Sequence, residues 1–134
     1  MRKVYISANL ADSPQDFKDM VSKLKEKLKE EYEILDAQKS LPRSDFVIAI
    51  CDHSSIDVGY DMATALEKYS KPTLGLAKAG MVVTRLVEGI DHPMYIFKTY
   101  NTVEDIETFI KEKELKHFKP AVPVEVCGTD VCAI

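Results

Sequence analysis

Two aspartates, four positions apart in a polar stretch after an apolar run, are the residues of this chain best suited to chemistry. The apolar run covers residues 46–51, and the polar residues 52–55 follow it at once. Such a run is typical of a parallel strand buried on both faces, and open parallel sheets bind ligands where their strands end. Asp57 and Asp61 then fall on the first turns of the next predicted helix, where a spacing of four places both carboxylates on one face.

Paired carboxylates of this kind suit glycosyl chemistry. One carboxylate attacks or stabilises an oxocarbenium-like sugar, and the other moves a proton. Ser54 and Ser55 are suited to cap the helix or to donate to a ligand oxygen, and Gly59 allows close approach to the backbone because it has no Cβ. The same residue types also have a structural interpretation, because the helix dipole favours acidic residues in a first turn and serine is a common N-cap. Both interpretations stay open at this point.

The chain alternates predicted strands with predicted helices, which indicates an α/β fold with a parallel sheet. Periodicity and turn residues predict strands at residues 3–8, 32–35, 46–51, 73–76 and 94–97. Helices are predicted after the possible caps Asp12 and Ser13 as far as residue 30, and at residues 58–69, 81–88 and 102–115. Residues 36–43 form a polar connection. The expected architecture is a Rossmann or flavodoxin-like three-layer sandwich with a five-stranded parallel sheet in the order 2-1-3-4-5.

This strand order brings two loops together at one edge of the sheet. The tips of strands one and three flank the topological switch point, where open α/β sheets bind their ligands. The end of strand one and the loop after it supply Tyr5, Ser7 and Asn9, which face residues 52–61 across the crevice. The sequence therefore predicts one site built from these two segments.

The composition is that of an acidic globular protein. The chain has 134 residues, of which 46% are hydrophobic, and a formal charge of −4. We expect one domain at residues 1–115, followed by an irregular tail at residues 116–134. The acidic balance argues against a nucleic acid polymer as partner, and no apolar run is long enough for a membrane span. The first residues are interpreted as a strand rather than a signal peptide, so we expect a cytoplasmic protein.

Other chemical motifs are weak or missing. The phosphate-binding patterns GxGxxG and GxxxxGK are both absent, and no Ser-His-Asp arrangement can be traced. Cys127 and Cys132 do not have the spacing of a common zinc knuckle, and His117 is the nearest further ligand, so we expect no metal and no cofactor. Asp52 has the position of a receiver-like phosphoacceptor, but the first strand lacks the acidic pair that such a magnesium site needs.

Three blocks of the chain resemble the nucleoside 2-deoxyribosyltransferase family, with the 2′-deoxynucleoside 5′-monophosphate N-hydrolases as the nearest branch. They are residues 4–10 (VYISANL), residues 44–72, which include SSIDVGYD and a final Lys-Pro, and residues 79–89 (AGMVVTRLVEG). The second block is the most specific, and together the blocks span most of residues 3–115. The resemblance implies a Rossmann-like sheet, cleavage of an N-glycosidic bond, and a homodimer or larger homo-oligomer with a shared site.

The resemblance also assigns roles to individual residues. In that family a glutamate attacks C1′ of the deoxyribose, and water or another base then resolves the intermediate. The nucleophile falls on Asp61, with Asp57 or Asp36 as the acid/base partner. The hydroxyl that contacts the substrate falls on Ser55, and a hydroxyl from a neighbouring subunit falls on Thr84. The contacts from the first loop fall on Tyr5, Ser7 and Asn9.

Three departures from the family pattern leave a rival function open. Aspartate replaces the glutamate, the connection at residues 36–43 is short, and Ala11 and Asp12 stand where the family has a phosphate-binding arginine. Misplacing a reacting group by about 1 Å can cost about a hundredfold in rate. The predicted function is an N-glycosidase or deoxyribosyltransferase acting on nucleosides or their 5′-monophosphates. The alternative is a non-catalytic protein of the same fold that binds a nucleotide or sugar phosphate.

Overall fold

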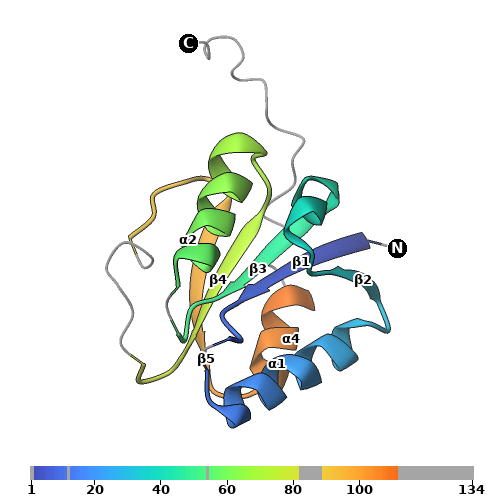
Figure 1. The fold of residues 1–134 in the computed structure, drawn as a ribbon, viewed down its shortest axis with the longest axis vertical. Helices are drawn as coiled ribbons and strands as arrows, with labels where there is room; N and C mark the ends of the chain where they lie inside the picture. The colour runs from blue at the N-terminus through green and yellow to red at the C-terminus, as the bar shows by residue number, and fades with distance from the viewer. Residues whose placement is uncertain (1, 12, 54, 82–88, 112–134) are drawn as a thin grey trace, which may run out of the picture.

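The computed structural model describes residues 2–11, 13–53, 55–81 and 89–111, and its centre is a five-stranded parallel sheet (Figure 1). The strands follow the order β2-β1-β3-β4-β5, and each pair of neighbours is parallel. This confirms the predicted α/β fold and strand order. The strands are β1 (Arg2–Ala8), β2 (Tyr32–Leu35), β3 (Phe46–Ile50), β4 (Thr73–Lys78) and β5 (Tyr95–Tyr100).

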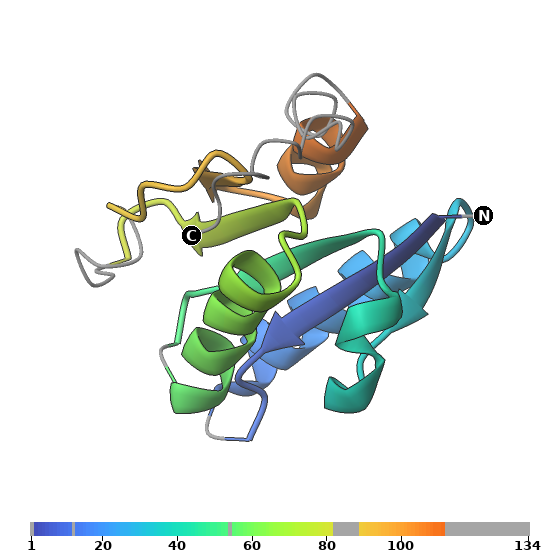
Figure 2. The ribbon, with the colours of Figure 1, turned by 90° about the horizontal axis from the view of Figure 1, so that it is seen from above.

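The central strand β3 is buried on both faces, as its continuous apolar sequence predicts. Alternate side chains point to opposite faces of a strand. Phe46, Ile48 and Ile50 therefore pack into the core with α1 (Gln15–Leu28) and α4 (Val103–Lys111). The side chains between them belong to clusters on the other face, which α2 (Ile56–Ala63) covers. Figure 2 shows α2 on the opposite side of the sheet from α1 and α4.

The site region lies where two neighbouring strands send their helices to opposite faces. The helix after β1 is α1, the helix after β3 is α2, and β1 and β3 are paired in the sheet. This divergence opens the switch point at the carboxyl ends of the two strands. Helix α2 begins before the predicted residue 58, because the Ser55 hydroxyl accepts a hydrogen bond from the Val58 backbone N–H at 3.1 Å. It continues into a π-helical turn, η2 (Thr64–Lys68).

The connection between β2 and β3 is more ordered than the sequence predicts. It contains a short 3₁₀-helix, η1 (Gln38–Arg43), in which Ser40 and Leu41 are buried. Leu41 packs against Tyr5 and Val47 on the α2 face of the sheet. The segment is therefore anchored over β1 by an apolar contact, and this anchoring brings Gln38 to the site.

Several predicted boundaries need correction. The predicted cap Ser13 does not cap α1, because Pro14 occupies the N-cap position and the Ser13 hydroxyl donates to the Asn9 carbonyl instead. Strands β4 and β5 run past the predicted ends at residues 76 and 97. Thr102 caps α4, since its hydroxyl accepts a hydrogen bond from the Asp105 N–H at 3.3 Å.

Some predicted features lie outside the described residues. They are Asp12, most of the predicted helix at residues 81–88, and the tail at residues 116–134 with Cys127, Cys132 and His117. In the described part of the chain, no helix has the length and apolar character needed to cross a membrane.

Candidate functional site

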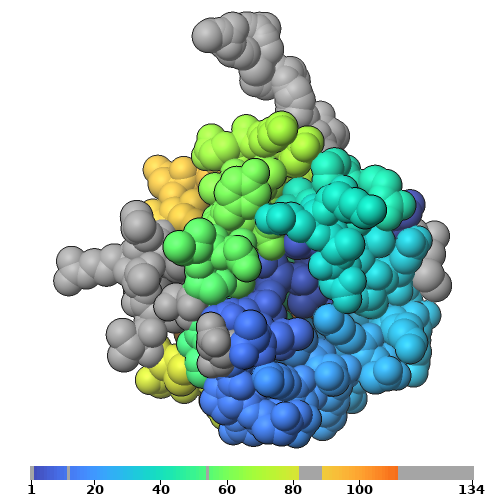
Figure 3. Space-filling model, in the orientation of Figure 1, coloured from blue at the N-terminus to red at the C-terminus, as the bar shows by residue number. Residues whose placement is uncertain are grey.

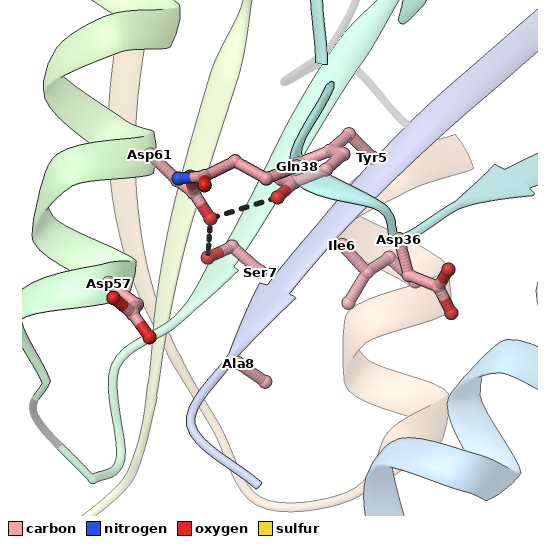
Figure 4. Close-up of a pocket in the computed structure, with 8 residues that line it drawn as sticks. All are labelled: Tyr5, Ile6, Ser7, Ala8, Asp36, Gln38, Asp57 and Asp61. Atoms are coloured by element: carbon pink, nitrogen blue, oxygen red, sulfur yellow. Dashed lines mark hydrogen bonds between the residues drawn. The ribbon is translucent and has the colours of Figure 1, made fainter. Parts of the chain in front are cut away.

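The site centres on a buried carboxylate with several hydrogen-bond donors. Asp61 of α2 is only 5% exposed. One of its oxygens, Oδ2, accepts from the Ser7 hydroxyl at 2.7 Å and from the Tyr5 hydroxyl at 3.0 Å. The other, Oδ1, accepts from the Gln38 side-chain amide at 2.9 Å. Figure 4 shows these side chains converging from β1, η1 and α2. The structure thus brings together three residues that the sequence assigns to the site, namely Tyr5, Ser7 and Asp61.

Strand and helix periodicity explain this convergence. Tyr5 and Ser7 are two residues apart on β1, so both point toward the α2 face, while Val4 and Ile6 pack in the opposite core. Asp61 lies one turn after Val58 on the inward face of α2, where an apolar residue would ordinarily be placed. A buried carboxylate is costly unless hydrogen bonds replace its water shell. The donors from β1 and η1 supply those hydrogen bonds.

The Tyr5 hydroxyl keeps its proton at neutral pH. Burial is the main cause that raises the pKa of Tyr5, and the hydrogen bond to the Asp61 carboxylate raises it further. Tyr5 is therefore a donor to Asp61 and not a base.

The buried carboxylate opens onto a cleft of about 210 Å³. Figure 3 shows this face hollowed where β1, η1 and α2 meet. Asp57, in the first turn of α2, is exposed and lines the cleft at a distance from the cluster around Asp61 (Figure 4). Asp36 also lines it, but its side chain is 66% exposed and lies 3.5 Å from the Lys25 ammonium group. The described lining residues are Tyr5, Ile6, Ser7, Ala8, Asp36, Gln38, Asp57 and Asp61.

Other predicted site residues have different surroundings. The Ser55 hydroxyl is engaged as the cap of α2, and Asn9 lies just past β1 without lining the cleft. A Cβ added to Gly59 would meet no heavy atom within 4 Å beyond its own stretch of helix, so no other described segment packs closely against it. Contacts of these residues with a substrate stay predictions. Ser54 and Thr84 lie outside the described residues.

Gln38 is the site residue that the sequence did not predict. It lies in the segment at residues 36–43, which the sequence presents as a polar connection. A lone glutamine after a short strand carries no local signal for a site. Its role depends on the contact of η1 with β1, and its bond to Asp61 joins residues 23 positions apart. Only the folded chain brings the two together.

A second buried carboxylate lies at the ends of β3, β4 and β5. Asp52 accepts from the Tyr100 hydroxyl at 2.6 Å and from the Lys78 backbone N–H at 3.0 Å. Burial, and then the hydrogen bond to Asp52, raise the pKa of Tyr100. The phenol therefore keeps its proton at neutral pH and donates it in the hydrogen bond to Asp52. Both oxygens of Asp52 hold the strand ends together, which is a structural role. Across the residues that the structure describes, no group of three or more His, Cys, Asp or Glu side chains is arranged to hold a metal ion.

Comparison with known proteins shows the fold alone. No protein-family model matches the sequence, and no curated protein matches it. Solved structures that resemble it include the lysine decarboxylase LdcF of Francisella novicida, with 15% identity and a TM-score of 0.54. The match covers 91% of this chain but only 18% of the decarboxylase.

Two smaller proteins match over most of their length. One is the N-terminal domain of the nisin resistance regulator NsrR, a lantibiotic response regulator, with 15% identity and a TM-score of 0.52 over 81% of this chain and 94% of that domain. The other is r2x3_168, a de novo designed Rossmann 2x3 fold protein, with 16% identity and a TM-score of 0.52 over 84% of this chain and 91% of the design. The chain therefore has a Rossmann-like α/β fold.

Proposed function

We propose that this protein is an N-glycosidase or deoxyribosyltransferase that cleaves the base–sugar bond of nucleosides or their 5′-monophosphates with a carboxylate nucleophile. The observation that carries the proposal is the Asp61 carboxylate, which three side-chain donors hold at the wall of the cleft. A nucleophile held in one geometry by its surroundings loses little entropy when it reacts. The resemblance of residues 44–72 to the deoxyribosyltransferase family assigns the nucleophile to the same residue.

In the proposed reaction, Asp61 forms a bond to C1′ of the sugar while the C1′–N bond to the base breaks. The electron pair of that bond leaves with the base nitrogen, which takes a proton from a carboxylic acid group. A water molecule or a second base then attacks C1′ and gives a proton back to the same acid group. The bond between C1′ and Asp61 breaks in this step, and its electron pair returns to the carboxylate.

Asp57 suits the role of the proton-transferring acid better than Asp36 does. It lines the cleft from the same helix as Asp61, one turn earlier. Asp36 is paired with Lys25, and Figure 4 shows its carboxylate pointing away from Asp61. Asp57 therefore remains the preferred partner in the proposed reaction.

The attacking oxygen in this mechanism is Oδ1 of Asp61. The bonds to Oδ2 from Tyr5 and Ser7 are buried, whereas the bond from Gln38 to Oδ1 is only partly buried. Tyr5 and Ser7 would fix the carboxylate, and Gln38 would orient the oxygen nearest the opening.

We also propose that the protein acts as a homodimer or larger homo-oligomer in the cytoplasm, with Thr84 of a neighbouring subunit at the site. In support, Ile56 and Tyr60 lie one turn apart on α2, and they are 89% and 61% exposed. Exposed apolar side chains grouped on one helix are typical of an interaction surface. Met62, on the same helix, packs in the core instead.

The alternative is a non-catalytic protein that binds a nucleotide or sugar phosphate in the same cleft. The donors on both oxygens of Asp61 favour this alternative, because hydrogen bonds make a carboxylate less nucleophilic. The second carboxylate at the cleft favours an enzyme, because glycosyl transfer needs such a pair.

Release of free base separates the two functions. The protein is incubated with ribo- and deoxynucleosides and their 5′-monophosphates, with and without an acceptor base, and the products are separated by chromatography. We expect base release by the unmodified protein and none by Asp61→Ala. Full turnover by Asp61→Asn would refute the assignment of the nucleophile. Thermal stabilisation by a ligand without any base release would favour the binding protein.

A further inference from the structure

The charge of the cleft bears on which substrates the proposed site can accept. Three of the described lining residues are aspartates, and none carries a cationic side chain. The partners of Asp61 are all uncharged, since they are a phenol, a hydroxyl and an amide. Its negative charge is therefore stabilised by hydrogen bonds without being neutralised, and it contributes to the potential in the cleft.

The start of α2 offers little to an anionic ligand. A helix N-terminus attracts phosphate through its dipole and its free N–H groups. Here the Val58 N–H is already bonded to the Ser55 hydroxyl. Asp57 also places a carboxylate in the first turn, on the side that lines the cleft. A phosphate that approaches this end of the cleft in the free protein would meet a carboxylate instead of a cation.

The lysine that forms an ion pair with a lining residue does not make the cleft positive. Lys25 lies 3.5 Å from the carboxylate of Asp36, so its charge is already shared with an acidic group. The described cleft therefore presents an excess of negative charge.

We infer that the site takes uncharged nucleosides and discriminates against their 5′-monophosphates, with Asp57 as the main specificity-determining residue. This inference rests on the proposed function for the nucleoside ligand. A nucleoside is neutral, and its sugar hydroxyls are donors that suit carboxylate acceptors. A phosphate monoester carries about −1.5 to −2 charges at pH 7 and has no cation to meet in the described cleft.

The test compares each substrate with its own monophosphate. The probes are 2′-deoxyadenosine, 2′-deoxyguanosine, 2′-deoxycytidine, thymidine and their 5′-monophosphates, and kcat/KM is measured from base release. We expect kcat/KM for a nucleoside to exceed that for its monophosphate by about tenfold or more at low salt. The ratio should shrink at about 1 M NaCl, where the Debye length is about 3 Å.

Two matched variants identify the residue responsible. Asp57→Asn is expected to lower the preference for nucleosides by about threefold or more, because it removes a charge that no cation among the described lining residues offsets. The measured quantity is kcat/KM for a nucleoside divided by kcat/KM for its monophosphate. Asp57 is also the proposed acid, so its loss lowers both values of kcat/KM equally and leaves this quotient to report on charge. Asp36→Asn is the control, because the Asp36 side chain is 66% exposed and points away from Asp61 (Figure 4), so solvent screens the charge that it removes. An equal change in both variants would overturn the assignment to Asp57.

The outcomes separate this inference from the proposed function. Equal or faster cleavage of the monophosphates overturns the charge selectivity and leaves the glycosidase standing. If no compound releases base, the proposed function fails, and calorimetric titration with the same eight compounds decides the selectivity. Binding of the nucleosides alone supports it, whereas binding of the monophosphates, or of neither kind, overturns it.

Discussion

The hydrogen bond between Tyr5 and Asp61 gives the most direct test of how the site is held together. Tyr5→Phe removes only the hydroxyl, and the ring can stay in place because Tyr5 is 3% exposed. The lost bond is a 3.0 Å contact with a buried carboxylate. Hydrogen bonds to charged groups contribute about 1.5–3 kcal/mol, so we expect the free energy of unfolding to fall by about 2 kcal/mol.

Urea unfolding followed by circular dichroism measures this loss. With an m-value of about 1.5 kcal/mol/M, a loss of about 2 kcal/mol lowers the urea midpoint by about 1.3 M. Tyr32→Phe is the matched control, because Tyr32 is half-buried and the structure records no hydrogen bond for its hydroxyl among the described residues. We expect the control to change stability by less than about 0.5 kcal/mol.

A double-mutant cycle with Asp61→Asn identifies the partner. When Asp61→Asn is already present, the acceptor is neutral, so Tyr5→Phe should cost about 1 kcal/mol less than in the unmodified protein. Equal costs with and without Asp61→Asn would show that the hydroxyl acts independently of the carboxylate. That result would refute the idea that donors from β1 compensate the burial of Asp61.

Further predictions concern the sheet, the pH range and the cleft. A Cβ on Gly75 would lie 2.1 Å from the Tyr95 hydroxyl oxygen, so Gly75→Ala should destabilise the protein by about 1–3 kcal/mol, as measured by urea unfolding. Gly59→Ala, which meets nothing, should instead stabilise it by about 0.5–1 kcal/mol, and a loss of turnover in that variant would support close substrate approach at Gly59. The raised pKa of Tyr100 means that the folded protein keeps a proton that the unfolded chain releases near pH 10, so stability should fall as the pH rises above about 10. Tyr100→Phe should make that fall shallower, and an unchanged slope would contradict the assignment. Gln38→Ala should lower kcat more than it raises KM if the Gln38 amide orients the attacking oxygen. Gln38→Glu places a second carboxylate beside Asp61, and the repulsion between them should lower kcat further.

Local sequence patterns were sufficient to predict the fold. The apolar run in β3 matches a strand buried on both faces, and the alternation of strands and helices led to the observed strand order. These features depend on side-chain periods of two and about 3.6 residues, which can be counted along the chain. The same periods explain why Tyr5 and Ser7 point to one face of the sheet and why Asp61 lies on the inward face of α2.

The tertiary structure determines the different surroundings of the three neighbouring aspartates. The sequence places Asp52, Asp57 and Asp61 within one short stretch, and their spacing alone does not show which of them is buried or which partners each one has. In the folded chain, Asp52 joins strand ends through Tyr100, Asp61 is enclosed by donors from β1 and η1, and Asp57 remains at the open cleft. The partners are 48, 56 and 23 residues away in the bonds that decide this.

The physical reason is that a hydrogen bond depends on distances of a few tenths of an ångström, whereas sequence patterns carry only the direction in which a side chain points. Periodicity therefore predicted that Asp57 and Asp61 share one face of their helix. It did not predict that the 3₁₀-helix η1, anchored by Leu41, would bring Gln38 to the other oxygen of that carboxylate. That contact depends on the packing of three separate segments, and packing is a property of the whole chain.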